Sequence, residues 1–122
     1  MTVRRLKTYT AQTGSVYQYY FVGRRAALPG EPEAPADEYV FDVTAGPIPR
    51  FAVSVFLRAD ALAAWAGAHG RALTAAEQYA AAKLRFIQDL EAVEPSTVAG
   101  ARRVAVNPEN IEELLAELEL GE

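Results

Sequence analysis

Strand-like sequence fills the first half of this 122-residue chain, and helix-like sequence dominates the second half. Residues 3–12 and 16–24 are rich in Thr, Tyr, Val and Phe, and the intervening Thr13-Gly14 suits a tight hairpin turn. Residues 38–44 alternate apolar and polar side chains, as a half-buried strand does, whereas residues 51–57 are apolar on both faces, as a covered central strand is. The first half therefore predicts a four-stranded antiparallel meander.

The second half carries helix patterns together with signals for helix ends. Helices are predicted over residues 60–69, 74–94 and 108–120. Thr74 and Glu77 have the spacing of a capping box, and Asn107-Pro108 combines a good N-cap with a good first helical residue. Residues 102–106 have the pattern of a short fifth strand. The predicted fold class is α+β, in which two central helices pack on one face of the meander and a C-terminal helix follows.

Length and composition indicate one globular domain spanning residues 1–122. The hydrophobic fraction is 51% and the charged fraction is 23%, and both are ordinary for a folded domain. Residues 26–37 contain three prolines and no periodicity, so we expect a mobile Pro-rich surface loop there. No apolar run is long enough for a membrane span, and no signal-peptide core follows the basic N-terminus, so we expect a cytoplasmic protein.

The sequence carries no motif for catalysis or for cofactor binding. It has no cysteine, which excludes disulfides, thiolate nucleophiles and Cys-ligated metal sites. It also lacks the Gly-x-Ser-x-Gly, P-loop and dinucleotide-binding patterns, so no cofactor is expected and enzymatic activity is disfavoured. The only histidine, His69, falls in the last turn of a predicted helix, where a cation interacts favourably with the terminal carbonyls. An enzyme or a pocket protein remains an alternative, with Arg50, Arg58 or His69 lining a cleft.

The predicted hairpin presents a basic face that also bears tyrosines. If Thr13-Gly14 are the two loop residues, Tyr17, Tyr19 and Phe21 share the core face. The opposite face is the candidate binding face, formed by Arg5, Lys7, Tyr9, Tyr20 and Arg24. Cations contact phosphates and aromatic rings stack on unpaired bases, so this face suits a nucleic acid or another anionic ligand. The net charge of −4 and the lack of an RNP-type sequence argue against nucleic acid, which stays an alternative.

Charge is segregated between the two ends of the chain. Residues 1–30 carry five basic residues and no acidic one, whereas residues 107–122 carry six glutamates and no basic residue. The predicted last helix has an apolar stripe, a candidate interface formed by Ile111, Leu114, Leu115 and Leu118. Apolar residues on the basic face of the hairpin indicate that something covers it, either this acidic helix or a second subunit. The leading hypothesis is a non-catalytic interaction module that binds a protein partner or itself through the sheet and the terminal helix.

Overall fold

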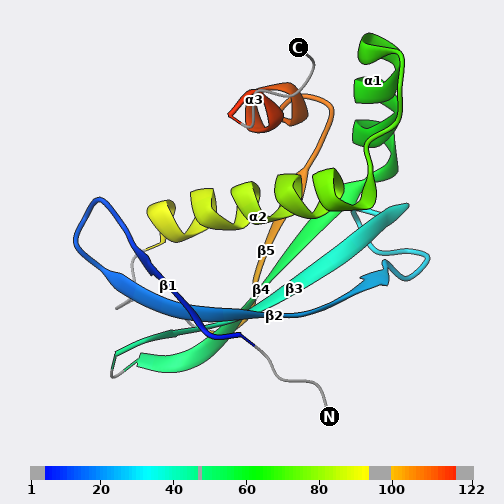
Figure 1. Cartoon of the computed structure of the whole chain (residues 1–122). Coiled ribbons are helices and arrows are strands. Elements are labelled where there is room, and N and C mark those ends of the chain that lie inside the picture. The colour runs from blue at the N-terminus through cyan, green and yellow to red at the C-terminus, as the bar shows by residue number, and fades with distance from the viewer. Residues whose placement is uncertain (1–4, 47, 94–99, 118–122) are drawn as a thin grey trace.

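The computed structural model describes residues 5–46, 48–93 and 100–117. In these residues a five-stranded sheet lies against a layer of helices (Figure 1). The strands are β1 (Lys7–Thr10), β2 (Val16–Ala26), β3 (Ala36–Ala45), β4 (Ile48–Arg58) and β5 (Arg102–Val106). The helices are α1 (Ala59–His69), α2 (Ala75–Ala92) and α3 (Ile111–Ala116). The predicted α+β class is confirmed, with its four-stranded antiparallel meander, its two central helices and its short fifth strand.

The strands lie in the order of the sequence, but β5 pairs with its neighbour differently from the strands of the meander. Strands β1 to β4 pair antiparallel with their neighbours, whereas β5 pairs parallel with β4. A parallel pair needs a crossover connection, which α1 and α2 supply between β4 and β5. The helices lie on one side of the sheet, which we call the helix-covered face; the opposite side is the outer face (Figure 1).

The register of the first hairpin differs from the predicted one by a single residue. The connection between β1 and β2 has five residues instead of two, and it is closed by a bond of 2.8 Å from the Ala11 N–H to the Ser15 carbonyl. Lys7 lies opposite Tyr19, and Tyr9 lies opposite Tyr17. A shift of one residue turns every side chain of a strand to the other face. Lys7 and Tyr9 therefore share the helix-covered face with the core tyrosines, and their predicted place on the opposite face is wrong.

A β-bulge at Val22 moves a second part of the predicted binding face. Phe21 pairs with Phe41, but the next paired residue of β2 is Gly23, so Val22 is the extra residue. Beyond the bulge, Arg24 lies opposite Tyr39 on the helix-covered face. The predicted position of Arg24 beside Tyr20 is therefore wrong. Tyr20 precedes the bulge and lies on the outer face opposite Asp42.

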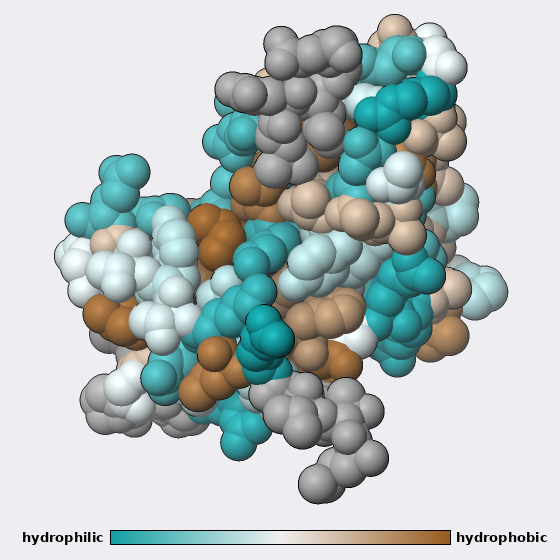
Figure 2. All heavy atoms as spheres, in the orientation of Figure 1, coloured by the Kyte–Doolittle hydropathy of each residue, from teal (hydrophilic) through white to brown (hydrophobic). Residues whose placement is uncertain are grey.

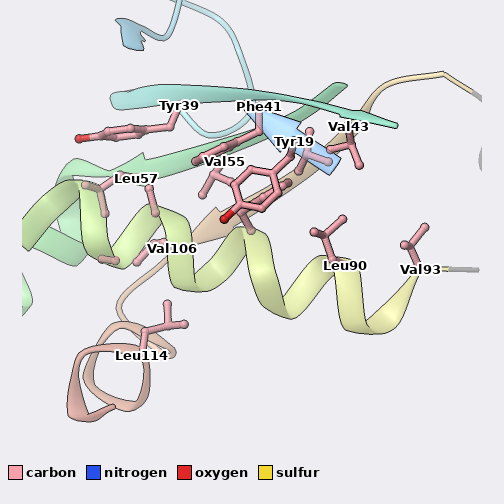
Figure 3. Close-up of a cluster of buried hydrophobic side chains, with 14 of the residues drawn as sticks. Tyr19, Tyr39, Phe41, Val43, Val55, Leu57, Leu90, Val93, Val106 and Leu114 are labelled. Carbon is pink, nitrogen blue, oxygen red and sulfur yellow. The ribbon is translucent and has the colours of Figure 1, made fainter. Parts of the chain in front are cut away.

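The core lies between the helix-covered face and α2. Side chains of β2, β3 and β4 point toward the apolar side of α2 (Figure 3). The rings of Phe41 and Phe86 stack with centroids 4.2 Å apart and planes inclined by 7°. Tyr19 meets Phe86 edge to face at 5.0 Å. These aromatic contacts join the centre of the sheet to the middle of α2.

The acidic C-terminal helix packs on the helix layer and leaves the first hairpin uncovered. It starts at Ile111 and contacts α1 and α2, and Glu112 approaches His69 Nε2 at 2.9 Å. Three stripe residues, Ile111, Leu114 and Leu115, are at most 1% exposed. Because β5 runs parallel to β4, it finishes at the end of the sheet where α1 begins, and the stripe of α3 completes the core there. The expected partner interface is wrong for these three residues, as is the expected cover of the hairpin by this helix; Leu118 lies outside the described residues.

The predicted capping box starts α2. The Thr74 hydroxyl accepts a bond from the Glu77 N–H at 3.1 Å, and the Glu77 carboxylate accepts one from the Thr74 N–H at 2.9 Å. Arg71 donates two further bonds to this carboxylate, at 2.8 and 2.9 Å. Arg71 and the Thr74 N–H together lower the pKa of Glu77 to about 2. The first turn of α2 is thus fixed by local polar contacts.

The connection between β2 and β3 is tied to the far edge of the sheet. Glu31 pairs with Arg103 Nη2 at 3.1 Å, and Glu33 pairs with Arg58 Nη1 at 3.2 Å. The flanking strands include residues 26, 36 and 37, so the connection is shorter than the predicted loop. Its predicted mobility stays a prediction.

Candidate functional site

The outer face of the sheet is one candidate site, because no described helix covers it (Figure 1). Its centre is apolar and holds Val40 of β3, flanked by the bulged Val22 of β2. Val22 is 36% exposed. Tyr20 and Ala52 extend this surface toward the other end of the strands. A sheet face that is fully solvated shows cleaner alternation of apolar and polar residues than this one does.

Two ion pairs flank the apolar centre of the outer face. At one end, Arg25 Nε lies 2.7 Å from Glu38 Oε1, and Glu38 is buried although Arg25 is exposed. This contact raises the pKa of Arg25. At the other end, Arg50 lies 3.7 Å from Asp42, whose carboxylate also accepts a bond of 2.8 Å from the Tyr20 hydroxyl. The outer face is therefore electrically neutral at both ends.

Two open hollows mark the same surface. One has a volume of about 300 Å³ and is lined by Val22, Gly23, Val40 and Arg25; Arg24, which lies opposite Tyr39 on the helix-covered face, borders it at the bulge. The other has a volume of about 240 Å³ and lies beside Leu6 and Tyr20. Shallow hollows of this kind suit the side chains of a protein partner better than they suit a small molecule, which usually binds in an enclosed pocket.

The second candidate site is a pair of lysines at the β1 edge of the helix-covered face. Lys7 and Lys83 are the only lysines among the twelve basic residues of the chain. Lys7 lies opposite Tyr19 in the sheet, and Lys83 Nζ lies 5.7 Å from the centroid of the Tyr19 ring. The nearby Lys83 ammonium group lowers the pKa of Lys7, because a second positive charge disfavours the charged form. Arg5 adds a third positive charge, which lowers this pKa further.

This lysine pair has no carboxylate partner within the part of the chain that the structure describes. The ion pairs of that part engage neither lysine, nor Arg5. Hydrophilic and hydrophobic side chains mix between α2 and β2 on this side of the molecule (Figure 2). Beside the pair, Phe21 and Tyr79 meet edge to face at 5.2 Å, and both are half-buried. The site therefore combines free positive charge with aromatic surface.

The predicted binding-face residues thus separate into different environments. Lys7 joins the lysine pair, with Arg5 nearby. Tyr9 donates a hydrogen bond to Glu91 of α2, and this bond raises the pKa of Tyr9 to about 12. Arg24 lies 6.0 Å from the centroid of the Tyr39 ring. Only Tyr20 of the five lies on the outer face.

Sequence reasoning missed Lys83 as a site residue. Its position flanking the apolar stripe of α2 is typical of a solvated helix face. The sequence offered one indication: the chain has only two lysines, so a contact between them was a single pair to consider. Their meeting depends on how β1 packs beside α2, which the residue pattern does not encode locally.

The residues suggested for a catalytic cleft do not converge. Arg50 lies on the outer face, while Arg58 bonds to Asp60 at 2.6 and 3.0 Å. His69 stacks on Trp65 with ring centroids 4.1 Å apart, and it reaches α3 rather than a cleft. A separate cleft of about 300 Å³ has arginines in its lining, but these are engaged by Glu31 and by the Ala105 carbonyl.

The described residues offer neither a metal site nor a membrane-spanning helix. The described residues contain no group of three or more side chains placed to hold a metal ion. Within those residues, no helix combines the length and apolarity that crossing a membrane needs. The compartment stays a prediction.

No protein-family model, curated protein or solved structure matches this chain. Its function is therefore inferred from the two candidate sites.

Proposed function

We propose that this protein is a non-catalytic interaction module that pairs with a second copy of itself through the outer face of its sheet. The observation that carries the proposal is the apolar centre around Val22 and Val40, left without a helix in the described residues. Burying such a surface against another protein releases water from apolar groups, and this release favours association.

Charge complementarity favours a second copy over an unrelated partner. The Arg25–Glu38 pair lies at one end of the apolar centre, and the Arg50–Asp42 pair lies at the other. A two-fold axis running across the strands near Val40 places each ion pair over the opposite pair of the other copy. Because this axis keeps β3 over β3, Glu38 of one copy comes over Asp42 of the other, with Arg25 on one side of the two carboxylates and Arg50 of the other copy on the other side, while the apolar centres meet. An isologous interface of this kind places two carboxylates between two arginines at each end, so opposite charges balance across it.

Nucleic acid fits the outer face less well. Its two arginines already neutralise carboxylates within the same chain, so phosphate groups would have to displace Glu38 and Asp42. Tyr20 also bonds to Asp42, which restrains the ring that would stack on a base.

The test is the oligomeric state of the full chain, measured by sedimentation from micromolar to millimolar concentration. We expect a dimer that Val22→Asp weakens by about tenfold or more, because an unpaired carboxylate would enter the apolar centre. Leu28→Asp is the matched control, since Leu28 is 59% exposed in the β2–β3 connection. It should leave the dimer intact.

Either of two results would overturn the proposal. One is a wild-type chain that stays monomeric at millimolar concentration. The other is a dimer that Val22→Asp and Leu28→Asp weaken equally, since the contact would then lie elsewhere. Circular dichroism of both variants establishes that each remains folded.

A further inference from the structure

We propose that the lysine pair, Lys7 and Lys83, binds the dianionic phosphate group of a small phosphate monoester. This site lies on the helix-covered side of the sheet and is separate from the outer face. Nothing in the proposed self-association uses it.

The geometry brings two ammonium groups from distant parts of the sequence to one place. Lys7 is the first residue of β1, and Lys83 lies in the middle of α2. Both stand over Tyr19, whose ring is buried and forms the floor of the site. Lys83 is also the residue that acts most strongly on the pKa of Lys7, and it lowers that pKa. An anion placed between them therefore contacts both at once.

Electrostatics favours an anion at this position. Like charges in contact repel, and the lowered pKa of Lys7 reports that repulsion. The exposed Arg5 increases it. The hairpin engages one acidic group of α2, Glu91, whose carboxylate accepts hydrogen bonds from the Tyr9 hydroxyl and the Gln12 N–H. A bound dianion would convert the repulsion into two attractive contacts.

The charge and shape of the site favour a monoester over other anions. A phosphate monoester carries about −1.5 to −2 charges at neutral pH, which matches two ammonium groups, whereas a phosphodiester carries only one. Lysine ammonium groups act as compact charges with three donors each, and they suit the three free oxygens of a monoester. Carboxylates supply fewer oxygens and a single charge.

The organic part of the ligand has a surface to lie against. Tyr79 is four residues before Lys83 on α2, and Phe21 is two residues after Tyr19 on β2, so the two rings lie beside the lysine pair. In the described residues β1 begins at Lys7, opposite Tyr19, and no described strand pairs with this edge of β2 beyond Tyr19. The half-buried rings are therefore accessible to an aromatic ester.

The test exploits the presence of only two lysines. The full chain, labelled with carbon-13 lysine, gives two sets of side-chain signals, which Lys7→Arg and Lys83→Arg assign. We expect phenyl phosphate and inorganic phosphate to shift both sets saturably at low salt, with phenyl phosphate binding more tightly. Lys83→Gln and Lys7→Gln should each weaken binding by about tenfold or more, because each removes one charge-assisted contact.

Arg103→Gln is the matched control, because it removes one positive charge at the opposite edge of the sheet. It should leave binding of both probes unchanged. The proposal is overturned if neither probe saturates, or if Lys83→Gln and Arg103→Gln weaken binding equally. Tighter binding of a single-stranded oligonucleotide than of phenyl phosphate would also overturn it, because the site would then recognise a phosphodiester. Wild-type chemical shifts elsewhere in each variant establish that it is folded.

Discussion

Removing the guanidinium of Arg102 should be among the most destabilising single changes of a polar residue in this protein. Arg102 of β5 donates two bonds of 2.7 Å to Asp89 of α2, from Nε to Oδ2 and from Nη2 to Oδ1. Asp89 is only 3% exposed, and the contact raises the pKa of Arg102. The pair joins the parallel edge strand to the long helix across the core. Arg102→Leu keeps the apolar bulk and leaves the carboxylate without its partner.

The expected cost follows from the burial of the two partners. Breaking a fully buried pair from one side costs about 3–5 kcal/mol, because one charge stays buried and unpaired. Here the Arg102 side chain is 36% exposed, so water reaches part of the vacated space. We therefore expect Arg102→Leu to lower the free energy of unfolding by about 2–3 kcal/mol. Replacing both residues with leucine removes the unpaired charge and should cost less than the single change.

Urea unfolding followed by circular dichroism measures these differences. The matched control is Arg103→Leu, the next residue of β5, whose partner Glu31 lies 3.1 Å away in an exposed ion pair. Exposed pairs contribute at most about 1 kcal/mol, so this variant should lose less than that. The reasoning fails if Arg102→Leu costs no more than Arg103→Leu. It fails equally if the double leucine variant is less stable than Arg102→Leu.

Three further predictions concern local contacts. Thr74→Ala should lower the free energy of unfolding by about 1 kcal/mol, measured in urea, while Thr74→Ser should retain stability because the cap oxygen is kept. Tyr9 should ionise at about pH 12 in a spectrophotometric titration, and Glu91→Gln should lower that pKa; since the pKa is raised on folding, the stabilisation is complete below pH 10 and is lost toward pH 12. Phe86→Ala should cost about 3–5 kcal/mol by urea unfolding, because it opens a cavity against Phe41, and a loss below 1 kcal/mol would contradict the stacking.

The sequence predicted the kinds and order of the elements because those depend on local patterns. Alternation marked β3, and the capping box marked the start of α2. The hairpin register depends on the number of residues in the turn, and Thr13-Gly14 suits a two-residue loop as well as a longer one. In the structure the loop has five residues, with Ala11 buried and its N–H bonded to the Ser15 carbonyl. No residue pattern within the hairpin distinguishes these alternatives.

Long-range placement was the other part that the sequence did not determine. The apolar stripe of the last helix was predicted, but the surface it buries depends on the direction of β5. A parallel β5 delivers Ile111 and Leu114 to the helix layer, where they become core residues. An antiparallel fifth strand would have ended at the other end of the sheet. Glu112 of the last helix therefore lies beside α1, where it contacts His69.

The one-residue shift in the hairpin also explains why the two candidate sites are independent. In the predicted register Lys7 would have shared the outer face with Tyr20, so one surface would have had to carry both anion binding and self-association. In the observed register the sheet lies between them, with Lys7 beside α2 and Val22 near the opposite surface. Changes at sites without shared partners add independently. Val22→Asp should therefore weaken pairing without altering phosphate binding, and Lys83→Gln should weaken phosphate binding without altering pairing. Coupling between the two would mean that the sheet does not separate them.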